Sequence, residues 1–353
     1  MTAESGAVKG WAWARVQVLP WLRRGGLLII AVVAVEYLVL PKLVGASGDL
    51  SLLRSAEPTL LVLALVLEMS SLTCYSLLTR ASLPDTGVPA FSTLMRIDLT
   101  GFGLSHVVPG GGATAAAVRI RLLVQAGVPP HTSIAGAAVQ TAAEVVTVIG
   151  LFASGVVISF QRAADNPLYA AAGWVALVLL VAVVGGVTLL VTRPQATQAG
   201  VHDLAARLPL RLSTPVESSM AGLTERVGGL AHDKALLSRT LGWAVANWAL
   251  DAAALWCCLR AYGFSAPVGP LLAVYGAVSL LALLPVTPAG LGVVEAVLIP
   301  AVAALGAATS VALLGVLTWR LVQFWLPVPV ALASYVSLRL GVLRHAFRTE
   351  FRW

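Results

Sequence analysis

Charged side chains are scarce in this sequence of 353 residues. Asp, Glu, Lys and Arg make up 11% of it, hydrophobic residues make up 58%, and the mean hydropathy is +0.89. An average soluble protein carries about 25% charged residues, so this composition excludes a soluble multidomain enzyme. Disordered chains are polar and charged, which excludes disorder as well. The composition, with 32 Gly and 19 Pro, indicates an all-α polytopic membrane protein.

Cysteine is also rare, and several catalytic motifs are missing. Cys74, Cys257 and Cys258 all lie in apolar segments, and their spacing matches no zinc site. We interpret them as buried thiols and expect no bound metal. The sequence contains no P-loop, no Gly-x-Ser-x-Gly elbow and no dinucleotide-binding glycine motif. We therefore expect no cofactor, no enzymatic activity and no ATP-driven pumping by this chain alone.

The formal net charge of +7 does not come from one compact basic patch. The basic residues stand mostly at the ends of apolar segments. That distribution is typical of topology signals and of contacts with anionic lipids. It argues against a nucleic-acid partner.

Long apolar runs define the predicted membrane segments. A helix that crosses a bilayer needs about 20 mainly apolar residues. Two further apolar stretches, 91–123 and 268–305, contain Pro and Gly near their middle, where neither favours a helix. We predict that each of these two forms a re-entrant hairpin of two half-helices. The predicted spanning helices, about six in number, are 27–44, 59–78, 132–159, 168–191, 241–262 and 308–338.

The predicted organisation is one transmembrane domain over 1–353. Its first half covers about 27–191 and its second half about 240–340, joined by a cytoplasmic amphipathic connector at 192–239 and followed by a basic tail at 341–353. With both hairpins re-entrant, most of the 23 Lys and Arg fall on the side that holds both termini, which predicts cytoplasmic termini. The hairpins then enter from opposite sides, as in an inverted pseudo-repeat with a binding site near the midplane.

The two chain breaks supply candidate binding groups. Glycines that open a half-helix leave backbone N–H groups free at the positive end of the helix dipole, where a phosphate or carboxylate binds well. The alternative is that the breaks serve helix packing alone, and that the histidine before the first break only bonds to loop carbonyls. The candidate residues at the breaks are His106, Pro109, Gly110, Gly111, Gly112, Pro288, Gly290 and Gly292.

Charged residues inside apolar segments are costly and usually functional. We predict that Arg96 and Arg320 hold a phosphate, and that Glu144 and Glu295 pair these arginines or take up protons. The alternative is that such pairs only fasten helices together. Glu68 is set aside because no other polar residue clusters with it. The charged candidates for the binding site are Arg96, Asp98, Arg119, Glu144, Glu295 and Arg320.

Three features together resemble a known family. They are the segment from Arg96 through the first break to Arg119, the run Pro-Val-Thr-Pro-Ala-Gly-Leu-Gly-Val-Val-Glu at 285–295, and Arg320. The chain resembles the flippase-like integral membrane proteins related to the transmembrane domain of lysylphosphatidylglycerol synthase, over about 27–340. In the bifunctional synthases a soluble aminoacyl-transferase domain follows the membrane region. Because this chain ends at Trp353, we expect no lysyl-lipid synthesis from it.

The resemblance implies movement of lipids between leaflets. We expect a translocase of the bacterial inner membrane that moves an anionic phospholipid, an aminoacyl-lipid or a polyprenyl-phosphate-linked headgroup through a polar cavity. The expected partners are anionic lipids, with a possible homodimer or a complex with a lipid-modifying enzyme. Two alternatives stay open, a secondary transporter of a small soluble anion and a non-transporting partner of a membrane glycosyltransferase.

Overall fold

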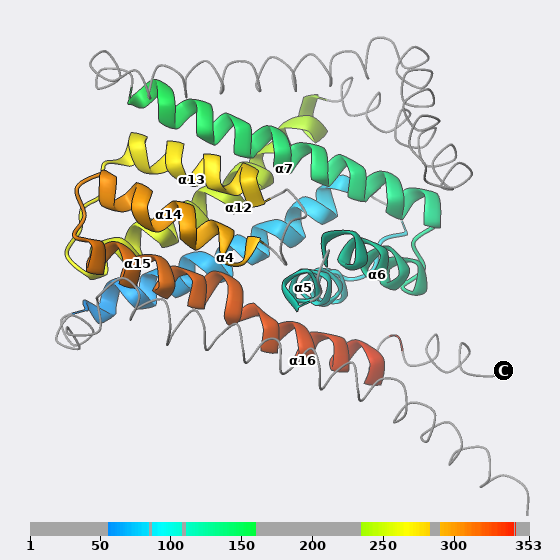
Figure 1. Cartoon of the computed structure of the whole chain (residues 1–353). Helices are drawn as coiled ribbons and strands as arrows, with labels where there is room; N and C mark the ends of the chain where they lie inside the picture. Colours follow the sequence, from blue (N-terminus) through cyan, green and yellow to red (C-terminus); the bar gives the residue numbers. More distant parts are fainter. Residues whose placement is uncertain are drawn as a thin grey trace, which may run out of the picture.

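The computed structural model describes residues 56–84, 87–107, 111–159, 234–282, 290–341 and 343. Every regular element in these residues is helical (Figure 1), which confirms the predicted all-α class for them. The predicted spans 27–44 and 168–191, both termini and most of the connector lie outside the described residues. In chain order the helices are α4 (Pro58–Ser82), α5 (Phe91–Val107), α6 (Gly111–Gln125), α7 (Pro130–Ile158), α12 (Lys234–Ala261), α13 (Val268–Ala282), α14 (Val293–Ala304), α15 (Thr309–Arg320), η4 (Leu321–Trp325) and α16 (Pro327–Leu340).

Three stretches of the described chain are long and apolar enough to cross a membrane. They are α4, α7 and the continuous stretch Thr309–Leu340, and they coincide with three of the predicted spans. A fourth long helix, α12, has 28 residues and extends about 42 Å at about 1.5 Å per residue. It begins at Lys234, inside the region predicted as connector. By length and composition, α4, α7 and Thr309–Leu340 are candidate membrane spans, and α12 is not among the helices that meet this criterion.

The last long stretch contains a π-helical segment that the sequence analysis did not predict. The Leu326 N–H donates to the Leu321 carbonyl over 3.0 Å, a bond that spans five residues instead of four. Pro327 and Pro329 follow directly, and neither has an amide hydrogen to continue the regular pattern. The wider turn therefore forms just before the prolines and just after Arg320. Single π turns inside α-helices are frequent at functional sites.

Both interrupted segments consist of two short helices, α5 with α6 and α13 with α14. Residues 108–110 and 283–289, which include Pro109, Gly110 and Pro288, lie outside the described residues. Gly290 and Gly292 have φ angles of 71° and 79°, a left-handed conformation that favours glycine over any residue with a Cβ. The chain therefore turns at these two glycines before it enters α14.

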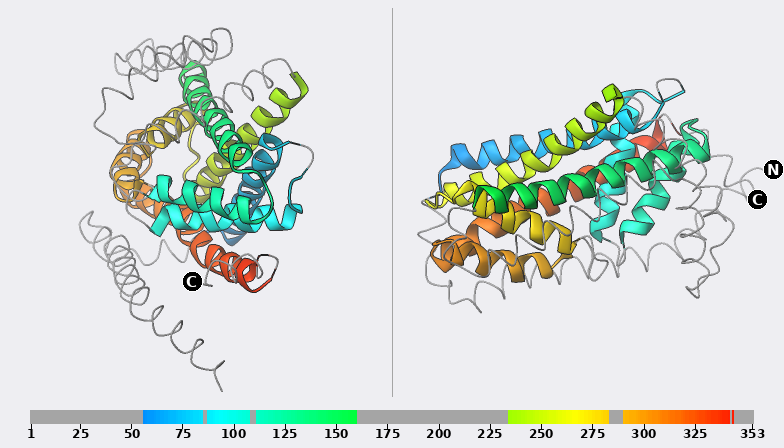
Figure 2. Two further views of the ribbon diagram at one scale, coloured as in Figure 1. Left: turned by 90° about the vertical axis from the view of Figure 1, so that its right-hand side faces the viewer. Right: turned by 90° about the horizontal axis from the view of Figure 1, so that it is seen from above.

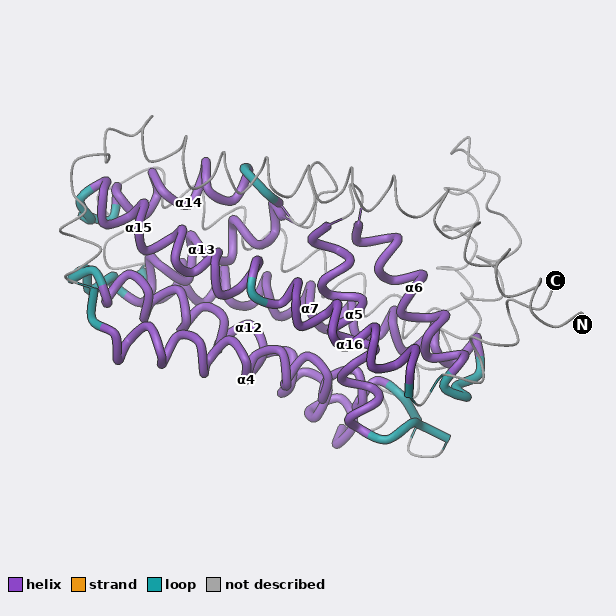
Figure 3. The backbone as a smooth tube through the Cα atoms, turned by 90° about the horizontal axis from the view of Figure 1, so that it is seen from below, coloured by secondary structure: helices purple, strands orange, loops and turns teal. Residues whose placement is uncertain are grey.

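The two halves of the described bundle are interleaved. The first long helices described in the two halves, α4 and α12 respectively, lie antiparallel and side by side (Figure 3). The Glu57 N–H at the start of α4 donates to the Ala261 carbonyl at the end of α12 over 3.0 Å. Ser71 on α4 donates to the backbone and side-chain oxygens of Asn247 on α12. Helix α5 packs on α16, and α13 packs on α7 (Figure 2). Each interrupted segment thus rests on a long helix of the other half.

The main apolar core lies among α12, α13, α14 and α15. Its most deeply buried members include Leu255, Leu259, Leu298 and Leu313. A smaller cluster joins α5, α6 and α16, so each interrupted segment has its own apolar support. The three cysteines are buried and free, as expected.

Small residues bring α7 and α13 close together. A Cβ on Gly155 would lie 2.7 Å from the Ala273 Cα, and a Cβ on Gly276 would lie 2.8 Å from the Phe152 Cα. Such close backbone approach through small residues is the usual means of packing helices in membranes. It fixes α13, and with it the second interrupted segment, against the first half of the chain.

We expect Gly155→Val to lower the midpoint of thermal denaturation of the purified protein in detergent. The added side chain clashes with α13, and overpacking costs about 1–3 kcal/mol. Gly150→Val is the matched control, because a Cβ at Gly150 on the same helix meets no atom within 4 Å. Equal midpoints for the two variants would contradict the close contact between α7 and α13.

Candidate functional site

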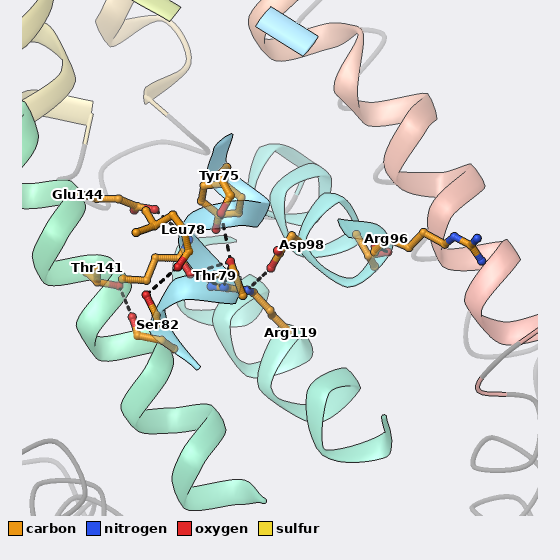
Figure 4. Close-up of polar contacts among 12 residues, drawn as sticks. Tyr75, Leu78, Thr79, Ser82, Arg96, Asp98, Arg119, Thr141 and Glu144 are labelled. Atoms are coloured by element: carbon orange, nitrogen blue, oxygen red, sulfur yellow. Dashed lines mark hydrogen bonds and ion pairs between the residues drawn. The ribbon is translucent and has the colours of Figure 1, made fainter. Parts of the chain in front are cut away.

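The first polar group surrounds Arg119 on α6 and is called the Arg119 cluster. The Arg119 Nε donates to Asp98 Oδ1 on α5 over 2.6 Å. Its Nη2 donates to Thr79 Oγ1 on α4 over 2.6 Å and to Gln140 Oε1 on α7 (Figure 4). One buried guanidinium therefore connects four helices, and its charge is neutralised by the buried Asp98 carboxylate.

Glu144 belongs to the edge of the Arg119 cluster. Its Oε1 accepts a hydrogen bond of 3.0 Å from Gln140 Nε2, one turn earlier on α7. The Tyr75 ring on α4 covers the other side of Arg119, with its centroid 5.5 Å from the guanidinium carbon. Glu144 is thus linked to Arg119 through Gln140. Gln140 also bonds to a second helix, because its Oε1 accepts from Thr79 Oγ1 on α4 over 3.0 Å.

Arg96 points away from the Arg119 cluster. It stands two residues before Asp98 on α5, which places the two side chains on different faces of the helix. Arg96 Nη1 donates to Ser337 Oγ on α16 over 3.1 Å, and Figure 4 shows its side chain directed toward that helix. Arg96 and Arg320 thus have separate partners, and their joint binding of a phosphate stays a prediction.

The second polar group lies at the start of α14 and is called the Glu295 cluster. Glu295 Oε2 accepts from the Gly292 N–H over 2.7 Å, and Glu295 Oε1 accepts from Arg320 Nε on α15. The pair is almost completely buried, with 1% and 3% of the Glu295 and Arg320 side chains exposed. A carboxylate is favourable at this end of a helix because it faces the positive end of the dipole. Glu295 therefore occupies the helix start that the sequence analysis assigned to an anion.

Arg320 retains hydrogen-bonding capacity beyond Glu295. Its Nη1 donates to Gln323 Oε1 over 3.2 Å, and its guanidinium carbon lies 4.6 Å from the centroid of the Phe324 ring. Its Nη2 is buried and has no hydrogen-bond partner within the described part of the chain. An unsatisfied donor that is buried costs about 1–3 kcal/mol, and more when it is charged. Arg320 Nη2 is thus a donor whose acceptor is not supplied by the described residues.

His106 connects the first break to the Glu295 cluster. Its Nδ1 donates to the Phe102 carbonyl over 2.6 Å, and its ring packs on the Phe324 ring with centroids 4.4 Å apart. Phe324 in turn lies on Arg320. The end of α5 therefore contacts the π-helical segment η4. Near the same break α6 begins at Gly111, and Gly112 is exposed.

A third polar group was missed and is called the dicarboxyl cluster. Asp251 on α12 accepts from Tyr275 Oη and from Trp319 Nε1, each over 2.7 Å. The buried Glu68 on α4 faces Asp251, because Ser71, one turn further along α4, bonds to Asn247, one turn before Asp251 on the antiparallel α12. The judgement that no polar residue clusters with Glu68 is wrong. The only signal in the sequence was one carboxyl in each of two apolar runs, because α4 and α12 meet through tertiary packing.

Asp98→Leu removes the carboxylate that neutralises Arg119 and leaves a buried charge unpaired. We expect the midpoint of thermal denaturation to fall, in line with the about 3–5 kcal/mol cost of breaking a buried pair. The double variant Asp98→Leu/Arg119→Met replaces both charges with apolar side chains, so we expect it to recover much of this loss. If the double variant lowered the midpoint of denaturation by the sum of the two single-variant effects, the two residues would not stabilise each other.

Comparison with known proteins agrees with the sequence motifs. Residues 26–331 match the family described as the lysylphosphatidylglycerol synthase TM region. The chain is also similar to a UPF0104 membrane protein of Methanothermobacter thermautotrophicus, with 26% identity over 314 residues that cover 81% of this chain and 86% of that relative. The family match includes both interrupted segments and all three polar clusters, and it confirms the predicted relationship. This chain therefore belongs to the family of the lysylphosphatidylglycerol synthase transmembrane region.

Proposed function

We propose that this protein moves a lipid with an anionic headgroup between the two leaflets of a membrane, and that the headgroup binds at the Glu295 cluster. The observation that carries the proposal is the buried Nη2 group of Arg320, which has no hydrogen-bond partner in the described residues. It lies beside the glycine turn that opens α14. Both features suit a phosphate with several acceptor oxygens.

Binding proceeds by exchange of one anion for another. In the present arrangement the Glu295 carboxylate satisfies the Gly292 N–H and the Arg320 Nε. A phosphate offers more oxygens than a carboxylate, so it replaces both contacts and also accepts from Nη2. Glu295 then neutralises Arg320 whenever no lipid is bound. Arg320 therefore has an anionic partner both with and without bound lipid.

One observation favours a lipid over a soluble anion as the substrate. The family description names the membrane region of a synthase of lysylphosphatidylglycerol, which is a phospholipid. We infer that the tails stay in the bilayer while the headgroup passes through the protein.

The packing of the helices supports an alternating mechanism. We interpret α5–α6 and α13–α14 as re-entrant hairpins that enter from opposite sides, and they occupy opposite ends of the bundle in Figure 1. Each hairpin packs on a long helix of the other half, α5 on α16 and α13 on α7. Rocking of one half against the other then opens the site to each side in turn, as in transporters with inverted repeats. The Arg119 cluster, with its guanidinium bonded to three helices, holds the first hairpin in place.

The direct test is lipid flipping in vesicles that contain the purified protein and fluorescent phosphatidylglycerol. A membrane-impermeant quencher reports how fast lipid from the inner leaflet becomes accessible. We expect Arg320→Gln to slow this rate at least about tenfold, which corresponds to about 1.4 kcal/mol of lost interaction. Arg320→Lys keeps the charge but loses the planar guanidinium that can bind two oxygens at once. We therefore expect its flipping rate to lie between those of wild type and Arg320→Gln.

Whereas Arg320→Gln is expected to weaken lipid binding, we expect Glu295→Gln to strengthen it. The variant removes the carboxylate that competes with the headgroup, so we expect a lower half-saturating lipid fraction than in the wild type. Arg260→Gln is the control, because Arg260 is exposed at the end of α12. Equal rates for wild type, Arg320→Gln and Arg260→Gln would overturn the proposal. Uptake of free inorganic phosphate without lipid flipping would establish the soluble-anion alternative.

A further inference from the structure

The dicarboxyl cluster has no part in headgroup binding as proposed above. It lies where α4, α12, α13 and α15 meet, and it contains Glu68, Asp251, Tyr275 and Trp319. Glu68 is 2% exposed and Asp251 is 8% exposed. The two carboxyls face each other across α4 and α12, where Ser71 bonds to Asn247 one turn away. Two carboxylates that face each other inside an apolar bundle repel strongly because the dielectric constant is low, which favours a proton on one of them.

The hydrogen bonds identify the charged partner. Asp251 accepts from Tyr275 Oη on one oxygen and from Trp319 Nε1 on the other, which stabilises a carboxylate. The Arg320 guanidinium adds a favourable electrostatic interaction with Asp251. Glu68, in contrast, faces Asp251 and has a buried Oε2 with no partner in the described residues. The fixed donors thus favour Asp251 as the anion and leave Glu68 as the carboxyl that carries the proton.

We propose that Glu68 binds and releases a proton, with Asp251 as its hydrogen-bond acceptor, and that this proton is coupled to the movement of lipid. The coupling rests on the proposed translocase function, whereas the proton site rests on the cluster itself. On release, the Glu68 O–H bond breaks and the proton passes to water on one side of the membrane. On binding from the other side, the same bond forms again.

A proton fits this cluster better than a metal ion does. Hard cations need six or more oxygen ligands, and here Tyr275 and Trp319 already use both oxygens of Asp251. No group of three or more His, Cys, Asp or Glu suited to a metal occurs in the described ranges. The pairing of two carboxyls with two fixed donors instead matches a shared-proton site.

The cluster is directly connected to the headgroup site. Trp319, which donates to Asp251, is followed by Arg320, and the π-helical segment η4 begins at the next residue. Helix α4, which carries Glu68, packs against both α12 and η4. Release of the proton leaves two adjacent carboxylates that repel each other and attract Arg320. We infer that this charge separates α4 from α12 and draws Arg320 away from Glu295.

The other ionisable groups around the pair come from three helices. Tyr275 faces it from α13, Arg320 from α15, and Cys258 from α12 itself. On α7, which also packs against α12, Glu144 bonds to Gln140 and belongs to the Arg119 cluster. None of these replaces Glu68 as the carboxyl that faces Asp251, so a variant at Glu68 isolates the proposed proton site.

Infrared spectroscopy of the purified protein tests the proton site without any transport. We expect the carbonyl band of a protonated carboxylic acid at neutral pH in the wild type, with part of its intensity lost in Glu68→Gln. Glu57→Gln is the matched control, because Glu57 lies at the exposed start of the same helix, and it keeps the full band. A band of equal intensity in wild type and Glu68→Gln would overturn the assignment of the proton to Glu68.

The coupling is tested by the equilibrium distribution of fluorescent phosphatidylglycerol in vesicles with a pH gradient and a clamped membrane potential. One proton per lipid predicts a ratio between leaflets of about tenfold per pH unit. This ratio is independent of the flipping rate, so slower variants remain informative. We expect the lipid distribution to follow the pH gradient in wild type and in Glu57→Gln. In Glu68→Gln we expect equal amounts of fluorescent lipid in the two leaflets. A wild-type distribution that follows a sodium gradient instead would overturn the coupling to protons.

The two measurements separate the two proposals. A protonated carboxyl at Glu68 in a protein that flips no lipid would support the proton site and overturn the proposed translocase. Lipid flipping that ignores the pH gradient, with no infrared change in Glu68→Gln, would overturn the inference and leave the translocase standing.

Discussion

The need to compensate buried charge organises the described part of this protein. Three polar clusters lie inside an apolar bundle, and each contains at least one ionised group that would be costly without a partner. In every case the partners come from different helices. Asp98 and Arg119 join α5 to α6, Glu295 and Arg320 join α14 to α15, and Asp251 joins α12 to α13 and α15. The same bonds that neutralise charge thus position both interrupted segments against the long helices.

The Arg119 and Glu295 clusters differ in which atom lacks a partner among the described residues. In the Arg119 cluster it is a carboxylate oxygen, Asp98 Oδ2, and in the Glu295 cluster it is a donor, Arg320 Nη2. Arg119 donates to three helices, and the Tyr75 ring covers its guanidinium. Arg320 has one carboxylate partner and one buried nitrogen without a partner in the described residues. It also borders the π-helical segment and the glycine turn at Gly292, two places where the backbone departs from a regular helix. A site that binds an anion needs an unsatisfied donor, which the Arg320 guanidinium supplies.

The sequence predicted the parts of this structure that depend on local patterns. Apolar runs located α4, α7 and the stretch Thr309–Leu340, and Pro and Gly located both interruptions. The cost of charge in a membrane singled out Glu295 and Arg320, which form a pair. The sequence did not reveal which arginine partners Asp98, nor that Glu68 faces Asp251, because these pairs depend on how distant helices pack. The π-helical segment was also missed, since two prolines near a helix start do not by themselves predict a wider turn.

The central claim is that Arg320 binds the headgroup of an anionic lipid, and direct binding tests it most simply. Native mass spectrometry of the detergent-purified protein, titrated with phosphatidylglycerol and with uncharged diacylglycerol, measures which lipid stays bound. The account predicts that wild type retains phosphatidylglycerol in preference to diacylglycerol, that Arg320→Gln loses this preference, and that Glu295→Gln strengthens it. Equal retention of phosphatidylglycerol by wild type, Arg320→Gln and Glu295→Gln would contradict the claim.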